Sequence, residues 1–214
     1  MEQEGVIKYQ LFFSHEKLVI APSILEEINL CRHALSGQSL IGQDDERYDG
    51  YGFGNISRRA DRHRSAFLIS GTQTGHLRTL TGGDLAYAES VDAVHNCVTA
   101  RGEVEPSSEA MTHGVLYQVS QCINAVVHVH SPDIWQQADQ LGLLFTAAST
   151  PYGTPQMASE VKALAAALLM TDLPFIFVMK GHEDGVVAAG PSLSSCCELI
   201  VQTLNQAKSV SLQT

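Results

Sequence analysis

The stretch Ala125-Val-Val-His-Val-His-Ser-Pro132 determines how the rest of the chain is interpreted. It has the apolar composition and the length of a short buried strand. Side chains alternate between the two faces of a strand, so His128 and His130 point the same way, and Val127 and Val129 face the other. Burying an unpaired polar group costs roughly 1–3 kcal/mol, so the two imidazoles need partners for their nitrogens. A metal satisfies that need, and hydrogen bonds to backbone or solvent are the alternative.

Length and composition indicate an ordinary soluble globular protein. The 214 residues are 44% hydrophobic and 17% charged, which predicts one domain over residues 1–214 with a sizeable core. No run has the length of a membrane helix, and the first ten residues, MEQEGVIKYQ, lack a basic region followed by an apolar core. We therefore expect a cytoplasmic protein.

The net charge limits the classes of partner that we expect, and the cysteines indicate the redox state of the thiols. The formal net charge of −10 would repel a polyphosphate backbone or an anionic membrane, so we expect neither nucleic acid nor membrane as a partner. A small-molecule substrate fits better. The five cysteines are scattered and contain no CxxC pair, which predicts reduced thiols rather than a disulfide framework or a thiolate zinc site.

Helical spacing and strand-like runs alternate along the chain. Helices are expected from Ser23, with Glu26 completing a capping box, from the capping serines Ser107 or Ser108, over Trp135–Leu144, from Pro155, and from Ser192. Strands are expected at Lys8–Phe13, Ala66–Ser70, Leu85–Val91, Ala93–Ala100 and Pro174–Met179. This mixture predicts an α/β protein.

Three turns carry residues that suit an anion. Gly54-Asn55 contains the second glycine of the pair Gly52 and Gly54, which lacks the third glycine of a dinucleotide fingerprint, so this segment is either a tight turn or a ligand-contacting loop. Ser70-Gly71 offers a hydroxyl and a backbone N–H at a strand end. Pro106-Ser-Ser-Glu109 places two serines and a glutamate at a helix N-terminus, which suits helix capping or an anion site beside a general base.

A third histidine completes a metal-ligand set. His182 stands just past the expected strand Pro174–Met179. With His128 and His130 it supplies three neutral nitrogens, the pattern of a catalytic zinc site with an open position. Glu109 is the natural fourth group, as a ligand or as the adjacent base. Such a site would polarise a carbonyl and make an enediolate accessible, and manganese, iron or cobalt would also suit the donors.

Taken together, these motifs resemble the class II aldolase/adducin family over roughly residues 24–205. The residues that carry the resemblance are Gly54-Asn55-Ile-Ser57, Ser70-Gly71, Pro106-Ser-Ser-Glu109, His128-Val-His130-Ser-Pro and a late His182. The resemblance implies a three-layer α/β/α fold with a central, mainly antiparallel sheet. It also implies a homotetramer with active sites near the subunit interfaces.

Members of the fuculose-phosphate aldolase kind bind zinc through three histidines, which match His128, His130 and His182. Their glutamate, a ligand and acid/base, matches Glu109. Their phosphate pocket corresponds to Gly54, Asn55, Ser70, Gly71, Ser107 and Ser108.

Two departures from the pattern of these relatives concern the proton donor and the setting of the late histidine. No residue between His130 and Pro151 matches the tyrosine that serves those relatives as a proton donor, and Tyr152 either replaces it or only packs. The late histidine stands in Gly181-His182-Glu183, whereas relatives have a His-Gly pair.

The sequence thus predicts a zinc-dependent aldolase-type lyase acting on a small hydroxy-carbonyl compound, a sugar or sugar phosphate, through an enediolate. A same-fold epimerase or dehydratase is one alternative. A non-catalytic adducin-like protein-interaction module is the other.

Overall fold

The computed structural model describes residues 5–61, 64–170 and 173–212. An eight-stranded sheet runs through them in the order β1-β7-β6-β5-β4-β8-β10-β9. Its strands are β1 (Gln10–His15), β4 (Asn55–Arg59), β5 (Phe67–Ser70), β6 (Leu85–Asp92), β7 (Cys97–Gly102), β8 (Ala125–His130), β9 (Phe175–Val178) and β10 (Gly185–Gly190). Only the pair of β1 and β7 is parallel among these neighbours. A two-stranded sheet, β2 (Gly42–Gln43) with β3 (Gly52–Phe53), lies beside it.

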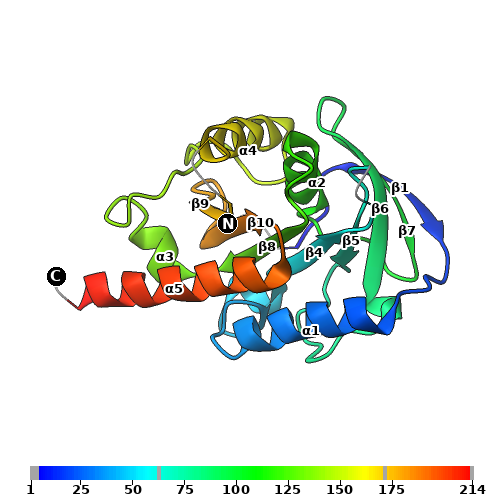
Figure 1. The fold of residues 1–214 in the computed structure, drawn as a ribbon, viewed down its shortest axis with the longest axis horizontal. Coiled ribbons are helices and arrows are strands. Elements are labelled where there is room, and N and C mark those ends of the chain that lie inside the picture. The colour runs from blue at the N-terminus through cyan, green and yellow to red at the C-terminus, as the bar shows by residue number, and fades with distance from the viewer. Residues whose placement is uncertain (1–4, 62–63, 171–172, 213–214) are drawn as a thin grey trace.

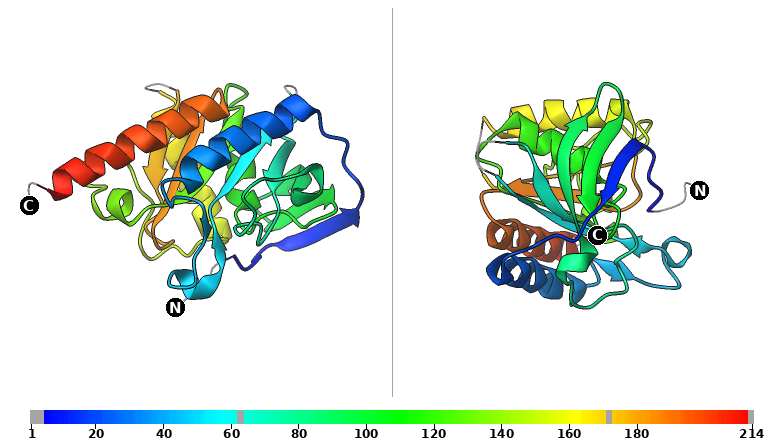
Figure 2. Two further views of the ribbon diagram at one scale, coloured as in Figure 1. Left: turned by 90° about the horizontal axis from the view of Figure 1, so that it is seen from below. Right: turned by 90° about the vertical axis from the view of Figure 1, so that its right-hand side faces the viewer.

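Helices cover both faces of the large sheet (Figures 1 and 2). They are α1 (Pro22–Ser36), α2 (Ala110–Val119), α3 (Pro132–Gln136), α4 (Pro155–Leu168) and α5 (Leu193–Ser211), with short 3-10 turns η1 (Tyr48–Gly50) and η2 (Gly82–Asp84). α2 and α4 pack together on one face, and α1 and α5 on the other. Within the described ranges, no helix has both the length and the apolar character needed to cross a bilayer. The expected three-layer α/β/α architecture is confirmed.

Two hydrophobic cores explain why β8 is apolar on both sides. Val127 and Val129 belong to the core under α1 and α5, whereas Val126 belongs to the core under α2 and α4. Because side chains alternate, His128 and His130 lie on the same side as Val126. The strand is buried throughout, between β4 and β10.

Most expected elements form, with shifted boundaries. α4 and α5 begin where the sequence predicts, with side-chain caps from Thr154 and Ser192. The strand expected at Lys8–Phe13 is Gln10–His15. The strand expected over Ala93–Ala100 begins only at Cys97, after a turn.

Three expected helix boundaries are wrong. α1 begins at Pro22 after Ala21, so Ser23 is inside the helix and does not cap it; proline favours the first helical position because its φ is preset and it has no N–H to satisfy. α2 begins at Ala110, so Ser107 and Ser108 precede the helix, held by the hydrogen bond from Ser107 N to Ser70 O.

The third boundary concerns the helix expected over Trp135–Leu144. It is instead Pro132–Gln136, capped by the Ser131 side chain. Turns follow the helix over residues 137–142, and they end at Gly142, which has a positive φ of 65°.

The prediction that all cysteines are reduced is also wrong. Cys31 of α1 and Cys197 of α5 form a disulfide with their Cα atoms 6.1 Å apart, while Cys97, Cys122 and Cys196 are free. Packing of α1 against α5 creates the pair across 166 residues of sequence, a separation for which local cysteine spacing carries no signal. The bond joins the two helices of one layer.

We expect Cys31→Ser to lower the free energy of unfolding by about 2–4 kcal/mol, because the cross-link restricts the unfolded chain. Chemical denaturation measures the change, with Cys122→Ser, an exposed free thiol, as the control. Alkylation of the denatured wild type should label three cysteines without reductant and all five with it. Five labels without reductant would contradict the cross-link.

Candidate active site

Three histidines from two separate segments converge in the interior. His128 and His130 come from β8, and His182 comes from the turn between β9 and β10. One ring nitrogen from each lies within 4.8 Å of the others. The Nε2 atoms of His128 and His130 are 3.1 Å apart, and all three residues are at most 3% exposed.

Sheet pairing produces this convergence. β10 pairs antiparallel with β8, which places Gly185 opposite His130. The β9–β10 turn therefore lies at the His130 end of β8, and its His182 ring comes to 4.8 Å from that of His130. His182, the third predicted ligand, therefore lies next to His128 and His130 because β10 is the neighbour of β8 in the sheet.

The donor set fits a divalent transition metal. Zinc bonds of about 2.0–2.1 Å in tetrahedral geometry put ligand nitrogens about 3.3 Å apart, close to the His128–His130 separation. His128 Nδ1 donates to Val186 O at 3.2 Å, which leaves its Nε2 lone pair directed at the cluster. Burial, and then the neighbouring His182, hold the pKa of His128 and His130 well below the usual value, so both rings are neutral, the form that binds metals.

The order Gly181-His182 has a steric reason. A Cβ at Gly181 would overlap the carbonyl oxygen of Thr150, so only glycine allows the two loops to approach this closely. The contact brings Tyr152 over His182, with ring centroids 4.3 Å apart and an interplanar angle of 18°. Lys8 Nζ lies 3.5 Å from the centroid of the Tyr152 ring.

Glu109 lies beside the histidines rather than among them. Its Oε1 is 3.8 Å from His182 Nδ1, and its Oε2 accepts a hydrogen bond of 2.7 Å from Thr112 Oγ1. The carboxylate is 2% exposed. It sits at the N-cap position of α2, where the helix dipole favours negative charge.

The other predicted site residues converge, with one exception. Gly54, Asn55, Gly71, Ser107 and Ser108 line one small cavity together with the loop 72–75. Asn55 pairs with His128 across β4 and β8, so this cavity adjoins the histidines. Ser70 does not line it, because its Oγ is turned to accept a hydrogen bond from Ile56 N at 3.1 Å.

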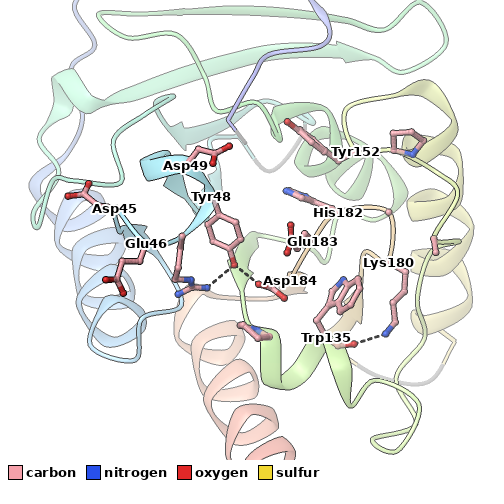
Figure 3. A pocket seen from close by; sticks show the side chains of 15 residues that line it. Asp45, Glu46, Tyr48, Asp49, Trp135, Tyr152, Lys180, His182, Glu183 and Asp184 are labelled. Carbon is pink, nitrogen blue, oxygen red and sulfur yellow. Dashed lines mark hydrogen bonds between the residues drawn. The ribbon is translucent and has the colours of Figure 1, made fainter. Parts of the chain in front are cut away.

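A larger cleft of about 890 Å³ opens beside His182 (Figure 3). Sequence reasoning missed one of its residues, Tyr48, whose ring meets His130 edge-on at 4.7 Å. Tyr48 donates to Asp184 Oδ2 at 2.6 Å and accepts from Arg47 at 2.8 Å. Burial, then the Asp184 hydrogen bond, raise the Tyr48 pKa. Its position in a polar loop offered no periodic signal.

His113 is the buried histidine of α2 that lies outside the cluster of three. Its Nδ1 lies 2.6 Å from Ser57 Oγ, which in turn is 2.8 Å from the Tyr117 hydroxyl. Burial lowers the His113 pKa to about 3, so the ring is neutral. His113 is therefore held by hydrogen bonds inside the protein and is not one of the three clustered histidines.

Comparison with known proteins connects this geometry to a family. The family model described as Class II Aldolase and Adducin N-terminal domain matches residues 43–209. A solved L-fuculose 1-phosphate aldolase superposes with a TM-score of 0.65 at 19% identity, covering 91% of this chain and 87% of that chain. YgbL from Klebsiella pneumoniae superposes with a TM-score of 0.64 at 17% identity, covering 91% of this chain and 91% of that chain. A sugar-phosphate aldolase from Thermotoga maritima superposes with a TM-score of 0.63 at 14% identity, covering 90% of this chain and 97% of that chain. These structures share the fold.

Proposed function

Because the chain belongs to the class II aldolase and adducin family, we propose that it is a metal-dependent aldolase-type lyase acting on a small hydroxy-carbonyl compound, a sugar or sugar phosphate. The observation that carries the proposal is the convergence of His128, His130 and His182 within 4.8 Å, with Glu109 beside them. A site that served only as packing would not need three buried imidazoles facing one another.

The three histidines would hold the metal, with zinc as the first choice. When bound, the metal supplies Lewis-acid polarisation of the substrate carbonyl. The stacked Tyr152 and the hydrogen bond from His128 to Val186 O keep two of the rings in orientation. Glu109 would either bind the resting metal as an additional ligand or lie next to the metal without binding it.

Glu109 acts as the acid/base. Its carboxylate takes the proton from the substrate hydroxyl as the adjacent C–C bond breaks, and the electron pair of that bond passes to the carbonyl side. Glu109 then returns the proton to the carbon left behind. The Thr112 hydroxyl keeps Oε2 in place, so Oε1 faces the histidines.

Gly54, Asn55, Gly71, Ser107 and Ser108 are proposed to bind the part of the substrate remote from the carbonyl, since they line the cavity beside His128. Ser70 is proposed only as a support, because its hydroxyl holds Ile56 N. We also propose that each chain is a single domain, that four chains form a homotetramer, and that the protein is cytoplasmic. Light scattering of the purified protein tests the oligomeric state.

The test is metal analysis joined to a cleavage assay. We expect about one divalent ion per chain, and release of an aldehyde or ketone from a panel of ketoses and ketose phosphates. Chelation should abolish cleavage, and added zinc should restore it. Epimerised or dehydrated products instead of two fragments would favour the same-fold alternatives. A folded protein that binds no added metal would favour the adducin-like interaction module.

Tyr152 can be tested as a positioning residue or as a proton donor. Tyr152→Ala removes the ring that stacks on His182, so metal affinity should fall by about 10–100-fold. Tyr152→Phe keeps the ring and should retain metal affinity. If Tyr152→Phe also keeps kcat, the residue only positions His182. A large loss of kcat with full metal content would identify the hydroxyl as the proton donor.

A further inference from the structure

The N-terminal segment, residues 5–9, precedes β1 and has an irregular conformation. It lies outside residues 43–209, which the family model matches, so its contacts with the candidate site are not part of that match. Gly5 lines the small cavity beside Asn55, and its carbonyl oxygen accepts a hydrogen bond of 3.5 Å from the Thr72 hydroxyl. Lys8 and Tyr9 make two further contacts with loops of the site.

Tyr9 anchors this segment in the protein. It is 5% exposed and belongs to the core under α2 and α4. Its hydroxyl donates to Ser107 O at 2.8 Å, on the loop that leads to Glu109. Burial, and then the charge of Glu109, raise the pKa of Tyr9, so its hydroxyl keeps the proton that it donates. Asn96 Nδ2 donates to Lys8 O at 3.0 Å, which fixes the backbone next to this anchor.

The Lys8 side chain packs along the loop that carries Tyr152. Its Nζ lies 3.5 Å from the centroid of the Tyr152 ring and donates to Tyr152 O at 3.3 Å. Its carbon atoms lie against Gly153, which has a left-handed φ of 70°, and a Cβ added there would come to 3.1 Å from Lys8 Cβ. An ammonium group over an aromatic face is attracted by the negative potential of that face. Lys8 therefore restrains both the backbone and the ring of Tyr152.

The Tyr152 ring transmits this restraint to His182. The two ring centroids are 4.3 Å apart, with an interplanar angle of 18°, and Figure 3 shows the two side chains next to each other. An ammonium nitrogen 3.5 Å from the Tyr152 centroid would overlap an imidazole stacked at that distance on the same face. Lys8 and His182 therefore lie on opposite faces of Tyr152. His182 in turn supplies one of the three nitrogens that lie within 4.8 Å of one another.

A role in packing alone would place the charge of Lys8 differently. The aliphatic stem of a lysine commonly covers apolar surface while its charged end reaches water. Lys8 is only partly exposed, and its ammonium group lies over the ring face of Tyr152 instead. Cation–π contacts are stronger when they are removed from water, so this arrangement restrains the ring more than contact with the stem alone would.

From these contacts we propose that the N-terminal segment is a working part of the candidate active site and that Lys8 is a positioning residue. Lys8 holds the Tyr152 ring against His182, which keeps the imidazole directed at the metal. Lys8 itself touches no reacting atom. The inference rests on the metal site of the proposed function.

The first test measures the zinc affinity of the purified protein by competition with a chromophoric chelator. Lys8→Met keeps the apolar stem and removes the charge, so the affinity should fall by about 3–10-fold, less than when the Tyr152 ring itself is removed. Lys8→Arg keeps a cation over the ring and should restore the wild-type affinity. Lys17→Met is the matched control, because Lys17 is an exposed lysine between β1 and α1. Equal affinities in all four proteins would overturn the proposal.

The second test observes His182 in the metal-free protein by NMR with ¹³C-labelled histidine. The His182 ring signal is identified by its absence in His182→Ala, and the ring current of the stacked Tyr152 displaces it. Lys8→Met should move this signal towards its position in Tyr152→Ala, and Lys8→Arg should leave it in place. An unmoved signal in a folded Lys8→Met protein would refute the role of Lys8. A wild type that binds no zinc would refute the proposed function instead, and the NMR comparison would still decide whether Lys8 positions His182.

Discussion

Replacing His182 with alanine is expected to remove the bound metal and to lower kcat/KM for cleavage by about 10³-fold or more. Two histidines on β8 remain, but two imidazoles do not complete the three-ligand site of a catalytic zinc. The expected loss follows from the position of His182 in the β9–β10 turn, within 4.8 Å of both other ligand nitrogens. Elemental analysis and the cleavage assay measure the two effects.

His95→Ala is the matched control, because His95 is an exposed histidine whose Nδ1 pairs with Asp92 at 2.7 Å. It should keep the metal and the activity of the wild type. A thermal melt of both variants separates loss of the site from loss of the fold. Full metal content and activity in a folded His182→Ala protein would refute the three-histidine centre.

The second large effect is expected from Glu109→Gln. The amide is nearly the same size as the carboxylate and can still accept from Thr112, but it cannot take or return a proton. We expect kcat to fall by about 10²–10⁴-fold, the usual contribution of a positioned acid/base. Metal affinity should fall less than in His182→Ala, because the three histidines remain. Steady-state kinetics and metal titration distinguish these two effects.

Glu105→Gln is the control for this substitution. Glu105 is an exposed carboxylate on the same loop, and its backbone carbonyl accepts the hydrogen bond from Thr72 N. Its variant should behave as the wild type. An unchanged kcat in Glu109→Gln would show that another group moves the proton.

Sequence reasoning reached much of this site because some of its geometry is local. Strand alternation alone places His128 and His130 on one face, and the structure has their Nε2 atoms 3.1 Å apart. Proline and serine or threonine at the helix starts correctly located α4 and α5. The same local rules misplaced α1 and α2, where proline at the first turn and the bridge between Ser107 and Ser70 compete with capping by serine.

The sequence by itself therefore determined the α/β alternation, the paired histidines of β8 and the acidic residue at the start of α2, since each depends on neighbours within a few positions. The tertiary structure alone decided which distant groups meet. The order of β4, β8 and β10 brings Asn55 and His182 to His128, and the packing of α1 on α5 joins Cys31 to Cys197. It also placed Tyr152 over His182. These contacts depend on how strands pair and layers pack between residues that are far apart in the sequence. Local periodicity in the sequence does not predict them.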